Sequence, residues 1–162
     1  MPRFPIGDRA AATTGLAPST GLLLMRLMIG AVGVYHGAQK LFGVFGGTGM
    51  DGFAGFVGTL GLPLPTANAW AAALSEFAGG ILIAAGLLTR PMAALFAVTM
   101  LVAAFVVHPG AFGAQHGGME YPLTLGIFSL AIMLMGAGRF SADAALARRA
   151  PGRGAPARIA SA

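Results

Sequence analysis

The chain has 162 residues, of which 56% are hydrophobic and only 9% are charged. An ordinary soluble domain carries about a quarter charged residues, so this composition excludes a typical soluble domain and indicates a membrane protein. Backbone groups in lipid must be paired internally, and period-two alternation is absent, so we predict an all-α integral membrane protein. The sequence contains no cysteine, which excludes disulfides, thiolate metal sites and dithiol redox chemistry within the chain.

The first 18 residues are polar and basic, and we expect residues 1–18 to form a disordered N-terminus ahead of a long apolar run. The first span is predicted at about 20–42. Because no convincing small-residue cleavage site follows this run, we interpret it as a retained first helix, not as a signal peptide.

Three more apolar stretches approach the roughly 20 residues that cross a bilayer, at about 67–88, 91–108 and 121–137. Together with the first span they predict a four-helix transmembrane domain over residues 19–143. In the first connecting loop, Phe53, Phe56 and Leu60 have helical spacing, which predicts a short amphipathic helix in the membrane interface. The remaining segment, 144–162, is predicted as a short helix capped by Ser141 and a basic Arg/Pro/Ala tail.

The distribution of basic residues predicts the orientation in the membrane. The loops at 43–66 and 109–119 contain no lysine or arginine, whereas the tails contain several arginines and the connection between spans two and three contains Arg90. With four spans, the positive-inside rule places both termini in the cytoplasm and the protein in a bacterial inner membrane. The basic tails lack the interleaved aromatic residues that stack on bases, so nucleic acid is not expected as a partner. The arginines on the predicted cytoplasmic side are Arg3, Arg9, Arg90, Arg139, Arg148, Arg149, Arg153 and Arg158.

The first span carries three ionisable residues, Arg26, His36 and Lys40. At about 100° per residue they lie on one arc of the helix together with several glycines, so this face is predicted to point inward. Glu76, near the middle of the second span, requires a cation, and ionisable residues at this depth indicate a functional site by default. Depth in the membrane does not distinguish Arg26 from Lys40 as the partner of Glu76. We interpret Arg26 and Glu76 as a structural ion pair, and the Lys40 side chain could extend to the membrane interface.

The outer ends of the later spans add His108, His116, Glu120 and Tyr121. The predicted topology brings these residues into the same half of the bundle as His36 and Lys40, where a pocket could bind a quinone headgroup, relay protons or hold a metal. A metal site is less favoured because two glycines interrupt the spacing of His116 and Glu120, and no third ligand is fixed. Haem is less favoured because His36 and His108 form no evident opposed pair at matching depth.

These motifs resemble the DoxX family of small four-helix membrane proteins. The resemblance rests on an early arginine, "HGAQKLFG", "LSEFAGG", "HPG", "GGMEYP" and "GAGRFSAD", and covers about residues 20–143. It implies motif positions at Arg26, His36, Lys40, Glu76, His108 and Glu120. Members of the family are commonly assigned as oxidoreductases. Some resemble subunits of thiosulfate:quinone or quinol oxidation systems, and others resemble membrane partners of soluble redox proteins.

Two functions therefore stay open at this stage. In the first, the protein is a redox-system subunit in which His36, Lys40, Glu76, His108 and Glu120 are candidate catalytic residues. A quinone would then contact His36, His108 and Tyr121, with buried groups moving protons. In the second, it is a non-catalytic accessory or assembly subunit that docks on a larger membrane redox complex, so other membrane or redox proteins are the expected partners in either case. A transporter is a third and weaker interpretation, because no inverted repeat is visible.

Overall fold

The computed structural model describes residues 15–149, and every regular element in that part of the chain is helical. The all-α prediction is therefore confirmed for the described residues. The α-helices are α2 (Leu16–Phe42), α3 (Gly49–Thr59), α4 (Pro65–Ala85), α5 (Thr89–Val102), α6 (Glu120–Met135) and α7 (Ala142–Arg149). Ala103–Val107 continues α5 as a π-helix, and Ala114–His116 forms a 3₁₀ turn.

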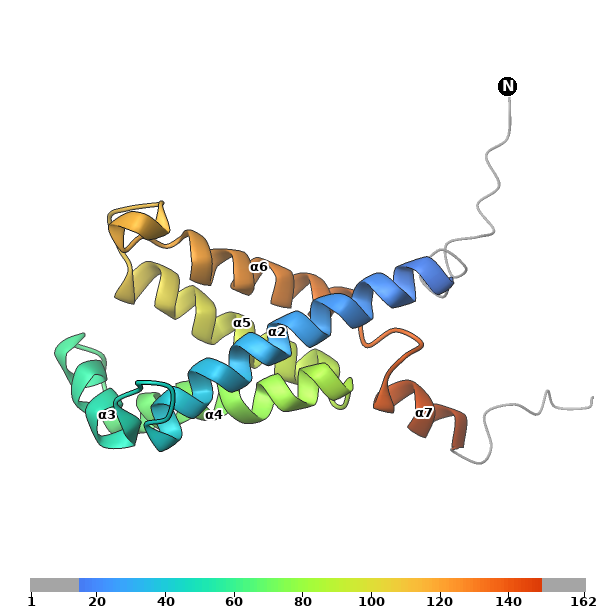
Figure 1. The fold of residues 1–162 in the computed structure, drawn as a ribbon, viewed down its shortest axis with the longest axis horizontal. Coiled ribbons are helices and arrows are strands. Elements are labelled where there is room, and N and C mark those ends of the chain that lie inside the picture. Colours follow the sequence, from blue (N-terminus) through green and yellow to red (C-terminus); the bar gives the residue numbers. More distant parts are fainter. Residues whose placement is uncertain (1–14, 150–162) are drawn as a thin grey trace, which may run out of the picture.

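Three of these helical stretches are long and apolar enough to cross a membrane: α2, α4 and the continuous stretch Thr89–Val107. The fourth apolar helix, α6, is shorter, with 16 residues. In the bundle, α2 packs along α4, α5 packs along α6, and α4 joins the two pairs through α5 (Figure 1). The described part of the chain therefore has the architecture of a membrane-type helical bundle.

The first helix begins at Leu16, earlier than the predicted start at residue 20. Pro18 lies in the first turn, where a missing amide hydrogen removes no intrahelical bond, and the Thr20 hydroxyl donates to the Leu16 carbonyl at 2.9 Å. The prediction of a disordered tail is therefore wrong for residues 16–18, and its residues 1–14 lie outside the described part. The predicted basic tail beyond Arg149 lies outside it as well.

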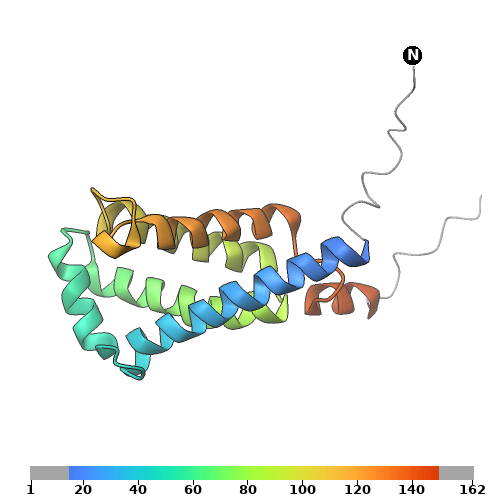
Figure 2. The same ribbon diagram turned by 45° about the horizontal axis from the view of Figure 1, so that its top comes forward.

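Two ends of the bundle can be distinguished in both views (Figures 1 and 2). One end carries α3, the C-terminus of α2 and the turn between α5 and α6, and we call it the Lys40 end. The opposite end carries α7 and the N-terminal half of α2, and we call it the Arg26 end. A core between the ends is built from small and apolar side chains on α2, α4, α5 and α6: Ile29, Ile83, Ala93, Phe96, Met100, Leu125 and Ile132.

Glycines allow α2 and α4 to pack with their backbones nearly in contact. A Cβ atom on Gly37 would lie 2.5 Å from the Phe77 nitrogen, and one on Gly33 would lie 2.7 Å from the Glu76 carbonyl oxygen. Small residues permit this approach in membrane helices, where the gain comes from van der Waals packing. The inward-facing arc predicted for α2 is confirmed, because Arg26, Gly33 and Gly37 are all buried.

Candidate functional site

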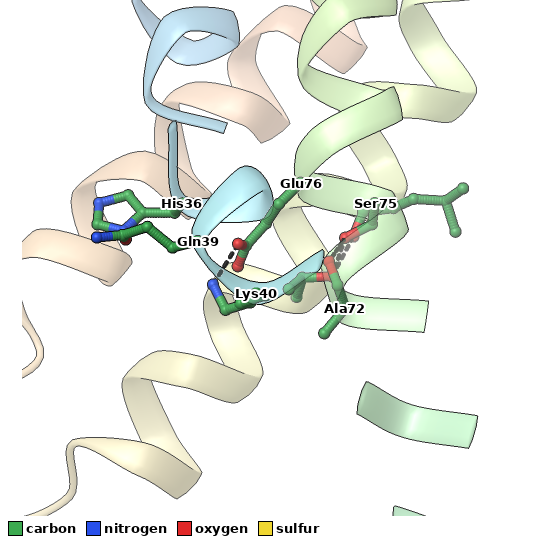
Figure 3. A network of polar contacts seen from close by, with 8 residues as sticks. His36, Gln39, Lys40, Ala72, Ser75 and Glu76 are labelled. Atoms are coloured by element: carbon green, nitrogen blue, oxygen red, sulfur yellow. Dashed lines mark hydrogen bonds and ion pairs between the residues drawn. The ribbon is translucent and has the colours of Figure 1, made fainter. Parts of the chain in front are cut away.

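An ion pair between Lys40 on α2 and Glu76 on α4 forms the centre of the Lys40 end (Figure 3). The Glu76 side chain is 4% exposed and the Lys40 side chain 23% exposed. The Lys40 ammonium also lies 5.3 Å from the centroid of the Phe53 ring on α3, within the range of a cation–π contact. Lys40 therefore connects three helices, α2, α3 and α4.

The structure corrects the predicted pair of Arg26 with Glu76. Side chains on an α-helix lean toward its N-terminus, and the Glu76 backbone lies against Gly33, between the two cations along α2. Lys40 therefore leans toward Glu76, whereas Arg26 leans away from it. Depth in the membrane could not distinguish the two candidates, but the direction of the side chains does.

Arg26 instead holds the chain that follows α6. It is fully buried, and its guanidinium donates a hydrogen bond to the carbonyl oxygen of Phe140. A Cβ atom on Gly86 would overlap the guanidinium, so this glycine at the end of α4 leaves the space that Arg26 fills. The guanidinium of Arg26 therefore stabilises the contact between α2, α4 and the segment before α7.

Asp143 on α7 completes this contact at the Arg26 end. Its carboxylate accepts hydrogen bonds from the Leu88 amide at 2.9 Å, the Thr89 amide at 3.0 Å and the Thr89 hydroxyl at 2.9 Å. Burial alone would raise the pKa of Asp143, but these hydrogen bonds and the charge of Arg26 together lower it. At the start of α7, the Ser141 hydroxyl accepts the Ala144 amide at 3.1 Å, which is the capping contact predicted for Ser141.

His36 is held in one orientation by Gln39, one turn further along α2. The Gln39 amide nitrogen donates to the Phe45 carbonyl at 3.1 Å, which leaves its oxygen to face His36 Nδ1 at 2.9 Å. An amide oxygen accepts only, so Nδ1 is assigned as the donor of this contact, and Nε2 is an acceptor when the ring is neutral. Sequence reasoning gave Gln39 no role; the i, i+3 spacing within "HGAQK" was the available signal.

His108 makes a similar contact through Nδ1, in a different structural setting. The π-helix at the end of α5 closes with a hydrogen bond from the His108 amide to the Ala103 carbonyl at 3.0 Å. His108 Nδ1 lies 2.9 Å from the Gly117 carbonyl oxygen, which can only accept, so Nδ1 is the donor and Nε2 is again the free acceptor. π-Bulges occur frequently at functional sites. Periodicity in the sequence did not reveal this one.

A cavity of about 150 Å³ lies between α2, α4, α5 and α6. It brings together five of the predicted residues, which are joined in its wall by apolar side chains such as Phe96, Met100 and Leu125. The ring of one of the five, Tyr121, lies 6.1 Å from that of His36, centroid to centroid. The predicted residues that line the cavity are His36, Lys40, Glu76, His108 and Tyr121.

Glu120 and His116 are not part of this cavity wall, although the topology predicted that they would join the cluster. Glu120 Oε1 accepts the Ala114 amide at 2.8 Å and so keeps the turn between α5 and α6 folded. His116 ends the 3₁₀ turn and is exposed. Both residues lie at the Lys40 end as predicted, but a local hydrogen bond turns Glu120 toward its own loop.

The arrangement combines two imidazoles with an ammonium–carboxylate pair around one small cavity. Imidazole nitrogens accept protons readily near neutral pH, and a buried carboxylate paired with lysine can exchange a proton with its partner. The cavity therefore presents both hydrogen-bond donors and acceptors to a small ligand.

The fold and the site define a helical membrane protein with a polar cavity at one end of its bundle. The DoxX family profile matches residues 21–109, and the chain belongs to the DoxX family. A relative in Bacillus subtilis (strain 168), named "Putative oxidoreductase CatD", is 34% identical over 112 residues, which is 69% of this chain and 78% of the relative. No solved structure matches the chain significantly. The family membership predicted from the sequence motifs is therefore confirmed.

Proposed function

We propose that this DoxX protein is a membrane subunit of a redox system and that its cavity binds the ring of a quinol. Support comes from the family membership, from the oxidoreductase name of its relative, and from the polar residues that converge on the cavity. A cavity of about 150 Å³ matches the volume that accommodates a single six-membered ring in an engineered protein core.

The single observation that carries this proposal is the hydrogen bonding of both histidine rings through Nδ1. Both Nδ1 atoms face carbonyl-type oxygens, so both neutral rings offer Nε2 as an acceptor. A quinone ring offers only acceptors, whereas the reduced quinol offers two hydroxyl donors. With both rings neutral, the two imidazoles therefore favour the reduced ring, while the Lys40 ammonium in the same wall is a donor. The sequence predicted a quinone in contact with these histidines, and we propose its reduced form as the ligand.

In this function each residue has a distinct role. His36 and His108 accept the hydroxyl hydrogens, Lys40 stabilises the phenolate that forms when a proton leaves, and Glu76 exchanges protons with Lys40. Oxidation of a quinol releases two protons and two electrons. The electrons would pass to a redox centre of a partner subunit, in agreement with the partners expected from the sequence.

We propose further that α6 is a fourth span and that both termini lie in the cytoplasm of a bacterial inner membrane. The arginines of the connection between α4 and α5 and of the α6–α7 segment lie toward the Arg26 end, as the positive-inside rule requires. The cavity at the Lys40 end then faces the outer half of the bilayer, with α3 in the outer interface. Reagents that label only the outer surface should modify a cysteine placed at Thr48 and spare one placed at Ala144.

Calorimetric titration of the purified protein in lipid nanodiscs tests the ligand. A ring without an isoprenoid chain, titrated anaerobically in its reduced and oxidised forms, should bind more tightly when reduced. His36→Ala and His108→Ala should each weaken quinol binding about tenfold, the effect of one hydrogen bond to a buried acceptor. His116→Ala, a matched change at an exposed histidine, should leave binding unchanged. Equal affinity for both forms, or insensitivity to His36→Ala, would sink the proposal.

A second function, that of a non-catalytic assembly subunit, is favoured by the way Lys40 and Glu76 satisfy one another while joining three helices. In that case Glu76→Gln should reduce the amount of a co-purifying redox complex. The quinol-dependent turnover per remaining complex should stay unchanged. The binding site predicts the opposite, a normal amount of complex with reduced turnover, so one purification with both measurements separates the two functions.

A further inference from the structure

A second cavity, of about 290 Å³, lies beside the first and is roofed by α3. Its walls come from α3, the loop that follows it, α4 and the last turns of α5. Most of the residues that line it are apolar. Those that line this α3 cavity and not the first are Phe53, Phe56, Val57, Leu60, Leu62, Asn68, Ala71, Ala72, Val98, Thr99, Val102 and Val107.

The two cavities share one wall. Lys40, Glu76, Ala103 and His108 line both of them, so the ion pair and one of the two imidazoles lie where the cavities meet. Ala103 begins the π-helix and has only a methyl group as its side chain. A ligand that contacts His108 from the first cavity therefore lies next to the second.

Away from this wall, the α3 cavity offers almost no free polar group. The Asn68 side-chain amide donates to the Pro63 carbonyl, and the Thr99 hydroxyl lies 3.1 Å from the Leu95 carbonyl and 2.6 Å from the Ser75 hydroxyl. Polar groups that already have partners do not attract a polar ligand. Apart from the side-chain oxygen of the exposed Asn68, the α3 cavity therefore offers hydrogen bonds to a ligand only at the end formed by Lys40, Glu76 and His108.

The rim of the α3 cavity opens toward the surface of the bundle. Phe56 is 45% exposed, Val98 60% and Val102 39%, and they lie on α3 and α5. In a membrane this surface faces lipid, so an apolar chain too long for the cavity could continue into the bilayer. The Lys40 contact with Phe53 holds the roof in place.

We propose that the α3 cavity holds the first isoprenoid units of a lipid quinol whose ring occupies the first cavity. The inference rests on the proposed function and deepens it by naming the substrate class, a ring with an isoprenoid chain attached. The ring lies between the imidazoles, the junction of ring and chain lies at the wall of Lys40, Glu76 and Ala103, and the chain leaves between α3 and α5. No redox step is needed for this binding mode.

The test uses a pair of quinols with the same ring, one without a chain and one with two isoprene units, titrated into the full-length protein in nanodiscs. Ala72→Leu fills the α3 cavity from α4 without touching the first cavity. It should weaken binding of the chain-bearing quinol about tenfold and change binding of the chainless quinol by less than about twofold. Ala78→Leu, on the exposed face of the same helix, should change neither and corrects for partition into lipid.

A second variant guards against a folding defect in Ala72→Leu. Val98→Phe fills the same cavity from α5 at an exposed position, and Leu95→Phe is its control, exposed on the same helix. The inference is overturned when the cavity-filling variants leave the chain-bearing quinol unaffected, or when both quinols lose affinity equally. When neither quinol binds the unsubstituted protein, the proposed function itself fails, and the inference fails with it.

Discussion

Two cations on the same helix, Lys40 and Arg26, solve the same energetic problem in different ways. A charge within a membrane helix costs several kcal/mol unless it finds a partner. Lys40 pairs with the carboxylate of Glu76 beside two cavities and remains partly exposed. Arg26 is fully buried against the Phe140 carbonyl, and the charge of Asp143 lies close enough to act on it.

This difference shows that a buried charge does not by itself identify a functional site. At the Arg26 end, the Phe140 carbonyl and Gly86 lie against the guanidinium, and the contact fixes the segment before α7. At the Lys40 end, the charged pair borders open space that a ligand can fill. We therefore infer that the Arg26 end stabilises the fold and that the Lys40 end binds the ligand.

The largest effect is expected from Arg26→Met, which keeps the volume and removes the charge. Loss of a charge-assisted hydrogen bond to Phe140 should destabilise the bundle by about 3 kcal/mol. Thermal unfolding in nanodiscs measures this change, and the protein that remains folded should bind the quinol normally. Unchanged stability together with lost binding would reverse the roles of the two ends.

A smaller loss is expected from Gly37→Ala, next to the Lys40 end. The added methyl group would lie 2.5 Å from the Phe77 nitrogen, so α2 and α4 must separate, at a cost of about 2 kcal/mol. Gly21→Ala on the same helix is the control, because a Cβ atom there meets nothing within 4 Å. Equal unfolding temperatures for the two variants would show that close packing is not required here.

Glu76→Gln should have a weak effect on stability and a strong one on the site. The amide oxygen can still accept from Lys40, which is partly exposed, so we expect a loss of only about 1 kcal/mol. Chemical unfolding curves for this variant and for Arg26→Met separate the two ends. A larger loss of stability for Glu76→Gln than for Arg26→Met would contradict the stabilising role of the Arg26 end.

The smallest effect is a pH dependence at the Arg26 end. The pKa of Asp143 is lower in the folded protein than its ordinary value of 3.8, so its contribution to stability is complete above that value. The contribution is lost as the pH falls below 3.8 through the folded-state pKa. The unfolding temperature should therefore fall less steeply with acid in Asp143→Asn than in the unsubstituted protein. Asp51→Asn on the exposed face of α3 should follow the unsubstituted protein.

Helical periodicity was sufficient to predict the inward face of α2 and the existence of α3. The buried arc of Arg26, Gly33 and Gly37 follows from 3.6 residues per turn, and the spacing of Phe53 and Phe56 corresponds to the helix Gly49–Thr59. These features depend on local sequence alone. They required no knowledge of which helices become neighbours.

The details of the site depend on geometry that periodicity does not contain. The partner of Glu76 is decided by the lean of long side chains toward the N-terminus of α2, and the position of His108 by a π-helix. Glu120 was expected in the cluster, but the Ala114 amide lies close enough to hold its carboxylate in the loop. This local hydrogen bond therefore keeps Glu120 out of the cluster that the topology predicted.

Parallel titration of Glu76→Gln and Arg26→Met with the chainless quinol distinguishes the roles of the two ends. Both variants are measured as folded protein in nanodiscs, so differences in yield do not enter. We expect about a tenfold loss of affinity for Glu76→Gln and less than about a twofold change for Arg26→Met. Equal losses in the two variants, or a loss confined to Arg26→Met, would show that the quinol does not bind at the Lys40 end.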